Sequence, residues 1–303
     1  MRMLLLAAAV RRAHGITNGN ILNRLADSLG GRRYAHCSVG VDGKLFVLGG
    51  FYTGNIPTNE SHVYDVASDI WSSVIAPAPV AVWNATAVVI DGFIYYYGGI
   101  DNSSGRPKYV YKYNIATNVW SVLSGSNTIE GRSGHSAVVI GGKIYVYGGI
   151  SNVWENRLYV FDPATGSWTA KANGPQAMQN HSAVVIDGKM YIFGGRNNSG
   201  VVIPTVYMYD PVSNLWSQKT SSPTPRHEHA ATVIDGKMLV VGGRSSNSGG
   251  NNATIEEYDP SSDTWTIRLT DDALLGTYPS ASEIAGKMYI FGGFSNLLYE
   301  YIP

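Results

Sequence analysis

Six apolar segments of this chain end in a Gly-Gly pair, and they recur at a nearly constant spacing. The period is 46 to 50 residues, as the second glycines show: Gly50, Gly99, Gly149, Gly195, Gly243 and Gly293. Two copies, at 188–195 and 286–293, share the eight residues GKMYIFGG letter for letter. Self-similarity at a fixed period of this length indicates a repeat architecture, which strongly limits the folds open to the chain.

The surroundings of each glycine pair predict four strands per repeat. An apolar run comes before each pair, and in five repeats it leads into a tight Asp-Gly or Gly-Gly turn, as in HSAVVIDGK at 181–189. In five repeats an aromatic residue follows, with a Trp seven positions later: Tyr64 and Trp71, Tyr113 and Trp120, Phe161 and Trp168, Tyr209 and Trp216, Tyr258 and Trp265. Charged residues are only 15% of the chain, which suits short buried strands. We predict an all-β fold, a β-propeller of four-stranded antiparallel blades.

These motifs resemble those of the kelch family. The resemblance rests on the Gly-Gly pairs, the aromatic and Trp pairs and the DGK turns, and it covers residues 20–303. It implies a six-bladed kelch β-propeller that serves as a soluble protein-binding scaffold. The near-continuous apolar runs agree with sheets that are covered on both faces.

The sixth repeat is incomplete, because no Trp strand follows its aromatic position in FSNLLYEYIP. The segment NILNRLAD at 20–27 stands where a fourth strand would precede the first inner strand. We therefore expect this N-terminal outer strand to complete the last blade and close the ring. The predicted organisation is an N-terminal tail or short helix over residues 1–18 and the propeller over 19–303.

Charge and composition exclude some classes of partner and site. The 22 basic and 22 acidic residues cancel, so no net field favours nucleic acid or an anionic membrane. Cys37 is the only cysteine, which excludes an intrachain disulfide and a Cys-rich metal site. Residues 1–10 are too few to span a bilayer. We favour a cytoplasmic monomer, with secretion as the alternative if residues 1–10 act as a signal peptide.

Strand direction alternates within a blade, so the long loops and the entrances to the inner strands share one face, the long-loop face. Its predicted ligand-binding residues are recurring arginines and nearby aromatics: Arg33, Arg132, Arg196, Arg226, Arg244, Tyr34, Trp83 and Trp154. Guanidinium forks match carboxylates, and loops on a rigid scaffold often carry binding residues. Blade packing is the alternative role for the arginines that precede inner strands.

Four histidines occupy another equivalent position on this face: His36, His135, His181 and His229. Ala85 and Pro279 take that position in the other two repeats. We favour blade packing for these histidines, because the resemblance to kelch repeats implies it: His and Arg at the start of the inner strand are common in that family and often serve blade packing. A metal site at His227 and His229 would need further ligands, so no metal or cofactor is assigned.

The whole pattern favours a non-enzymatic scaffold that binds an acidic peptide or protein segment, or an anionic glycan, at the long-loop face. No catalytic residue is assigned. The alternative is an enzyme acting on an anionic sugar, because sialic-acid mutarotases are also six-bladed kelch-like propellers with Arg and a carboxylate in the funnel. No local motif maps that activity onto named residues of this chain.

Overall fold

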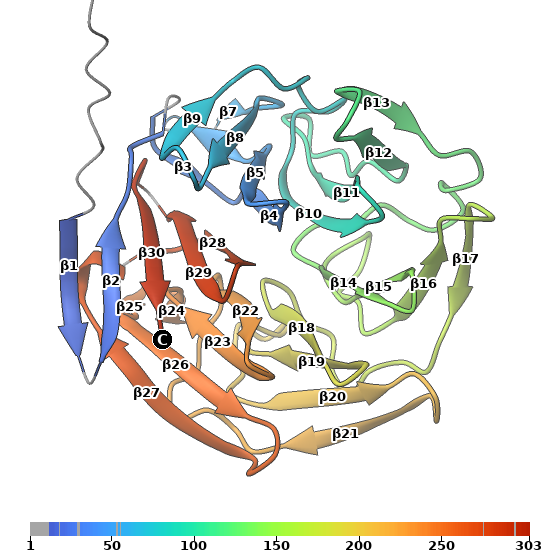
Figure 1. The fold of residues 1–303 in the computed structure, drawn as a ribbon. Helices are drawn as coiled ribbons and strands as arrows, with labels where there is room; N and C mark the ends of the chain where they lie inside the picture. Colours follow the sequence, from blue (N-terminus) through green and yellow to red (C-terminus); the bar gives the residue numbers. More distant parts are fainter. Residues whose placement is uncertain are drawn as a thin grey trace, which may run out of the picture.

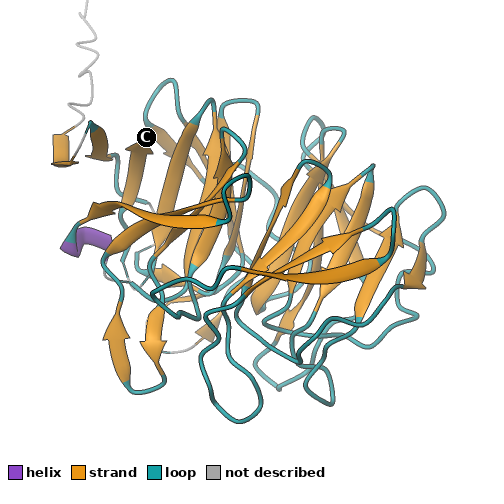
Figure 2. Ribbon diagram, turned by 90° about the horizontal axis from the view of Figure 1, so that it is seen from below, coloured by secondary structure: helices purple, strands orange, loops and turns teal. Residues whose placement is uncertain are grey.

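The computed structural model describes residues 12–17, 19–28, 31–52, 54, 56–274, 276–293 and 295–303. Over these residues the secondary structure is almost entirely β, with one short 3-10 helix at Asp272–Leu274. Figure 1 shows the sheets arranged around a common centre. Figure 2 shows their strands running between two loop-bearing faces. The chain is all-β and has the architecture of a β-propeller.

The described residues form six antiparallel sheets of at least four strands, which we number 1 to 6 in chain order. Sheet 1 contains β4 (Cys37–Val41), β5 (Lys44–Leu48), β8 (Ser61–Asp65) and β9 (Ile70–Ser72). Sheet 2 contains β10 (Trp83–Ile90), β11 (Phe93–Ile100), β12 (Val110–Asn114) and β13 (Val119–Val122). Sheet 3 contains β14 (Ser136–Ile140), β15 (Lys143–Tyr147), β16 (Leu158–Asp162) and β17 (Ser167–Ala170).

The remaining sheets follow the same order of strands, with insertions in the loops. Sheet 4 contains β18 (Ser182–Ile186), β19 (Lys189–Phe193), β20 (Val206–Asp210) and β21 (Leu215–Lys219). Sheet 5 contains β22 (Ala230–Ile234), β23 (Lys237–Val241), β26 (Thr254–Asp259) and β27 (Thr264–Thr270). Sheet 6 contains β28 (Pro279–Ile284), β29 (Lys287–Gly292), β30 (Leu298–Ile302), β2 (Asn20–Arg24) and β1 (Arg12–Thr17). Two small sheets lie in the loops: β3 (Arg33–Tyr34) with β6 (Phe51–Tyr52) and β7 (Ile56–Pro57), and β24 (Arg244–Ser246) with β25 (Gly249–Asn251).

Sheet 6 combines strands from both ends of the described chain (Figure 1). β2 pairs antiparallel with β30, so Ile21 lies opposite Ile302. The segment that the sequence places beside the last repeat therefore begins with a strand in that position. β1 pairs in turn with β2, which makes 12–17 a strand where the sequence predicts a tail or short helix. This extra pairing satisfies the N–H and C=O groups that β2 would otherwise expose at its outer edge. Residues 1–11 and 18 lie outside the described residues.

Apolar clusters fill the space between neighbouring sheets. Tyr147 of β15 and Met190 of β19 belong to one such cluster, between sheets 3 and 4. Leu45 of β5 and Phe291 of β29 belong to another, between sheets 1 and 6. Because each square ångström of apolar surface removed from water is worth about 25 cal/mol, these clusters are the main force between sheets.

The recurring tryptophans also join each repeat to the one before it. The indole N–H donates to a backbone carbonyl at 2.7–3.1 Å in all five cases: Trp71 to Ala26, Trp120 to Ala76, Trp168 to Ser126, Trp216 to Ala172 and Trp265 to Thr220. Each indole also packs on the aromatic ring seven positions earlier, with centroids 4.9–5.3 Å apart. For Trp71 the acceptor, Ala26, belongs to the segment that follows β2.

The Gly-Gly pairs permit a close approach at the end of each second strand. Gly148 and Gly149 have φ angles of +69° and +83°. A Cβ on Gly148 would lie 2.7 Å from Cε1 of His181, and a Cβ on Gly149 would lie 2.7 Å from the Ser133 carbonyl oxygen. The pair recurs because both the backbone conformation and the neighbouring atoms exclude a side chain.

Candidate functional site

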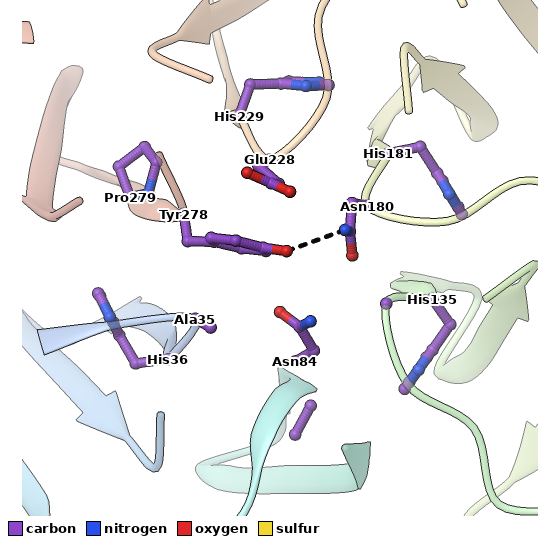
Figure 3. A pocket seen from close by; sticks show the side chains of 12 residues that line it. Ala35, His36, Asn84, His135, Asn180, His181, Glu228, His229, Tyr278 and Pro279 are labelled. Carbon is purple, nitrogen blue, oxygen red and sulfur yellow. Dashed lines mark hydrogen bonds between the residues drawn. The ribbon is translucent and has the colours of Figure 1, made fainter. Parts of the chain in front are cut away.

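The inner strands begin around a central cavity on the long-loop face. The residue directly before the histidine position of each repeat lines this cavity: Ala35, Asn84, Gly134, Asn180, Glu228 and Tyr278. We call these six residues the channel ring, and we call His36, His135, His181 and His229 the histidine ring. The cavity measures about 130 Å³ (Figure 3).

Backbone hydrogen bonds connect all members of the channel ring. Each N–H donates to the carbonyl of the equivalent residue in the preceding repeat, at 2.8–3.4 Å. The cycle is complete, because the N–H of Ala35 donates to the carbonyl of Tyr278. Every member has a φ between +53° and +63°. This left-handed conformation is uncommon outside glycine, and its sixfold use holds the side chains in equivalent directions.

The channel ring is uniform in its backbone but varied in its side chains. Two members carry no polar side chain, whereas the other four point into the cavity: Asn84, Asn180, Glu228 and Tyr278 (Figure 3). The Asn180 amide donates to the Tyr278 hydroxyl at 3.1 Å. The cavity therefore presents amide, carboxylate and phenol groups from four different repeats.

Glu228 is the acidic member of the channel ring. Its carboxylate lies 2.6 Å from Arg244 Nη2 and 3.2 Å from His227 Nδ1. Burial alone would raise the pKa of the Glu228 carboxyl, but the hydrogen bonds and charges of His227 and Arg244 hold that pKa below its usual value. Burial and the nearby Glu228 charge raise the pKa of Tyr278, which stays a neutral phenol. The centre of the cavity is thus polar, with its carboxylate paired to Arg244.

The histidine ring ties neighbouring sheets together. Each Nε2 lies 2.8–2.9 Å from a hydroxyl of an adjacent sheet: His36 with Ser280, His135 with Thr86, His181 with Ser136 and His229 with Ser182. Burial lowers the pKa of His36 and His181 to about 3, so both are neutral at physiological pH. These contacts fit blade packing, the role that we favour for this set.

The two repeats without this histidine lack the hydroxyl partner as well. By equivalence, Ala85 would face Cys37 and Pro279 would face Ala230, and neither partner position carries a hydroxyl. The Tyr96 hydroxyl lies beside Gly49, and Pro279 lies beside Gly242, whereas an imidazole lies beside the equivalent glycine of the other four repeats. Histidine and hydroxyl are therefore present or absent together, as expected when a buried polar group needs a hydrogen-bond partner.

Three of the predicted ligand-binding arginines are buried. Arg33, Arg132 and Arg226 are 1%, 1% and 0% exposed. Their partners lie within the protein: Arg33 donates to Glu60 and Tyr52, Arg132 to Gly148, and Arg226 to Gly242, Thr254 and Glu256. Burial leaves no guanidinium surface for a ligand, so the alternative of blade packing fits these arginines and the predicted binding role does not.

The other two predicted arginines do not line the cavity but lie next to its lining, Arg244 beside Glu228 and Arg196 beside Gln179. We call this rim of the cavity the mouth. Arg244 is 29% exposed at its side chain and is paired with Glu228. Arg196 is half-buried and donates to Asn247 at 3.3 Å. With its amide oxygen facing Arg196, Gln179 accepts from Nε and Nη2 at 3.0 and 2.9 Å. No carboxylate in the described part of the chain pairs with Arg196, so its charge is uncompensated.

The predicted aromatic residues come from sheets 1 to 3. Tyr34 and Trp83 lie on either side of Phe51, with ring centroids 3.8 and 5.3 Å from it. Tyr34 is 6% exposed, whereas Trp83 and Trp154 are half-buried. Sheets 1 and 2, whose loops carry Phe51 and Trp83, lie across the common centre from sheets 4 and 5, whose loops carry Arg196 and Arg244 (Figure 1). We call the loops of sheets 1 and 2 the aromatic side.

Sequence reasoning missed the polar members of the channel ring. Each stands directly before the histidine position, but the residue type changes from repeat to repeat, so no recurring motif marks it. The sequence nevertheless contains a usable signal. At the start of the inner strands one position holds histidine in four of the six repeats, whereas the residue directly before it changes from repeat to repeat.

In the described part of the chain, no three His, Cys, Asp or Glu side chains are grouped to hold a metal ion. His227 and His229 have different partners, Glu228 and Ser182. No helix in this part of the chain has the length and apolar composition needed to cross a membrane.

Comparison with known families agrees with this architecture. A family model described as the KLHDC2/KLHL20/DRC7 Kelch-repeats domain matches residues 134–301. A second, described as the Attractin/LZTR1 beta-propeller, matches residues 23–203. Each match covers more than half of the chain. The chain belongs to the kelch-repeat β-propeller family.

Individual relatives share only part of their length with this chain. Kelch-like protein 23 of Homo sapiens is 38% identical over 96 residues, which cover 31% of this chain and 17% of that protein. Kelch domain-containing protein 3 of Bos taurus is 25% identical over 158 residues, which cover 46% of this chain and 41% of that protein. The chain thus spans less than half the length of these curated relatives. The solved "Structure of YjhT" shares the fold, with a TM-score of 0.76 and 17% identity over 91% of this chain and 96% of that one.

Proposed function

We propose that this protein is a non-enzymatic scaffold that binds an acidic peptide segment across the mouth of its central cavity. The observation that carries the proposal is the uncompensated charge of Arg196, which stands across the mouth from the aromatic side at Phe51 and Trp83. Membership of the kelch-repeat family supports a binding scaffold.

The two sides of the mouth suit different parts of one ligand. Arg244 is already paired with Glu228, so Arg196 supplies the free positive charge for a carboxylate. A hydrogen bond to a charged group is worth about 1.5–3 kcal/mol. On the other side, Trp83 and Phe51 offer rigid aromatic surface, which binds a side chain at low entropic cost. A peptide with an acidic residue followed by an apolar one would contact both Arg196 and the aromatic surface.

An enzyme acting on an anionic sugar is the main alternative, with an anionic glycan as the other ligand class. Glu228 and Tyr278 would be the reactive groups of such an enzyme. Glu228 is paired with Arg244, and Tyr278 accepts from Asn180. The cavity of about 130 Å³ is also smaller than the roughly 300–1,000 Å³ typical of small-molecule sites. These features favour a ligand that lies across the mouth over one that enters it.

A displayed library of random dodecapeptides tests the proposal. Selection on the wild-type protein should enrich peptides with an acidic residue close to an aromatic or aliphatic one. Arg196→Ala should weaken binding of a selected peptide by about tenfold, or about 1.4 kcal/mol. Enrichment of neutral or basic peptides would contradict the proposal, as would tighter binding to sialylated glycans than to any selected peptide.

Lys189→Ala is the matched control for the loss of one positive charge. Lys189 lies at the short-turn face, 4.0 Å from Asp210, away from the mouth. Peptide affinity should be the same as for the wild type. An equal loss in both variants would mean that overall charge, and not the mouth, governs binding.

We further propose that sheets 1 to 6 form a closed six-bladed ring in which β2 is the outer strand of the last blade. The cycle of backbone hydrogen bonds in the channel ring and the bond from Trp71 to Ala26 support this. Deleting residues 1–28 should lower the melting temperature by about ten degrees or more, because β30 and Trp71 both lose their partners. Deleting residues 1–18 removes only β1 and should have a much smaller effect. Equal effects of the two deletions would rule out this role for β2.

A further inference from the structure

A second groove lies on the long-loop face, at the outer part of sheets 2 and 3. Its volume is about 480 Å³, within the range of about 300–1,000 Å³ that is typical of ligand sites. The loop between β11 and β12 contributes Arg106, Lys108 and Tyr109 to its lining. Glu130, before the inner strand of sheet 3, and Asn152, after its second strand, also line it.

The cationic loop of this groove is ordered by its own hydrogen bonds. Asp101 Oδ1 accepts from the backbone N–H of Ser103 at 2.9 Å and of Gly105 at 2.8 Å. The loop also packs closely on the chain before sheet 3, since a Cβ on Gly131 would lie only 2.0 Å from the Arg106 carbonyl oxygen. Because these bonds and this packing hold the loop, binding would cost little ordering entropy.

Arg106 and Lys108 bring two positive charges to the groove without an ion-pair partner. Over the described residues neither side chain forms a salt bridge, and Arg106 Nε is buried with no hydrogen-bond acceptor. Glu130 is the single acidic residue in the lining, and it is exposed to solvent. The groove therefore keeps a positive surplus, which favours an incoming carboxylate.

Two tyrosines add aromatic surface beside these charges. Tyr109 is 42% exposed, and Tyr111 is 7% exposed. Burial raises the pKa of Tyr111, so its phenol stays neutral in the groove. Tyrosine and arginine are the residue types that most often dominate protein-binding surfaces. Charge and aromatic surface together suit a carboxylate carried by a peptide better than a small free anion.

We infer that this groove is a second anchor for the acidic peptide segment, in which Arg106 and Lys108 hold a carboxylate and Tyr109 packs against the next side chain. The inference rests on the proposed function, because it extends the same ligand class along the same face. Asn152 lines the groove and is two residues from Trp154, so the 150–154 loop connects this groove with the predicted binding surface at the mouth.

The test repeats the dodecapeptide selection on the double variant Arg106→Ala/Lys108→Ala. Wild-type protein should select two acidic positions, and the variant should lose the preference at one of them. A peptide selected on wild type should bind the variant about tenfold more weakly, as expected for the loss of a charge-assisted contact. An unchanged motif and affinity in the variant would overturn the second anchor, while the effect of Arg196→Ala would still report on the mouth.

Three controls keep the result specific. Lys143→Ala/Lys189→Ala also removes two positive charges, but from the short-turn face. An equal loss of affinity in this control variant would overturn the inference. Inorganic phosphate at millimolar concentration should not displace the peptide, whereas efficient displacement would show a small-anion site instead. Tyr109→Ala should weaken binding several-fold. Thermal unfolding of Arg106→Ala/Lys108→Ala should match wild type, because neither side chain forms an ion pair in the described part of the chain.

Discussion

The histidine ring and the channel ring stand next to each other at the start of the same strands, but they differ in what they repeat. The histidine ring repeats a side chain, which is buried and bonded to the adjacent sheet. The channel ring repeats a backbone conformation and changes its side chain around the cavity. In a repeat protein, a recurring side chain serves the interface that all repeats share. A side chain that varies among repeats can instead contribute to a site that occurs once in the molecule, such as a ligand-binding site.

The arginines divide in the same way. Arg226, which has equivalents before two other inner strands, is fully buried between loops of its own repeat. Arg196 occupies a position that changes among repeats, with Phe51, Ile100 and Ile150 in the earlier ones and Arg244 in the next, and it carries an uncompensated charge. Recurrence on the long-loop face is therefore a sign of packing, and departure from the repeat is a better sign of function.

Of the variants considered, Arg226→Ala should lower the unfolding free energy most. A small loss would contradict the view that the recurring arginines serve packing. Glu256 is 1% exposed and lies 2.5 Å from Arg226 Nη2, so the variant leaves a buried carboxylate without its partner. Removing one partner of a buried ion pair costs about 3–5 kcal/mol of unfolding free energy. Urea unfolding of the variant measures this loss. Adding Glu256→Gln should recover part of it, because the uncompensated charge is removed.

His181 should give a smaller loss that depends on pH. Its pKa of about 3 lies below the usual value of 6.5, so the unfolded chain takes up a proton first as the pH falls. The stabilisation is complete above about pH 6.5 and is lost between about pH 6.5 and 3. At pH 5 protonation of His181 in the unfolded state should cost about 2 kcal/mol relative to neutral pH.

His181→Gln provides the measurement for this pH effect. The variant should be less stable than wild type at neutral pH, because the bond to Ser136 at 2.9 Å is disturbed. Its unfolding free energy should fall less steeply than that of wild type between pH 7 and 5. Identical slopes for the two proteins would mean that His181 is not held neutral by burial.

The fold was predictable because the residues that make its main contacts recur at the same position in successive repeats. Trp120 and Gly148 recur at fixed positions since each makes a contact that every pair of neighbouring sheets needs. The strand β1 was not predictable, because it pairs with β2 at the outer edge of a sheet and no repeat contains an equivalent. The burial of Arg226 depends on Glu256, thirty residues later in β26, and the path of the intervening loop is not marked by any motif. Pairings of this kind, including Arg244 with Glu228, become visible only when the loops are placed in space.

Asn180→Gly should have the smallest effect on stability, and it is the most direct test of the difference between the channel ring and the histidine ring. Asn180 has a φ of +54°, which glycine adopts without strain, and Gly134 already occupies the equivalent position with a φ of +63°. The variant loses only the bond to the Tyr278 hydroxyl at the cavity, so we expect the unfolding free energy to change by less than about 1 kcal/mol. Peptides selected on wild type should nevertheless bind the variant several-fold differently, because the amide faces the cavity beneath the mouth. If Asn180→Gly instead destabilised the protein as strongly as His181→Gln and left peptide binding unchanged, the channel ring would be a packing element like its neighbour, and variation among repeats would not mark the functional surface.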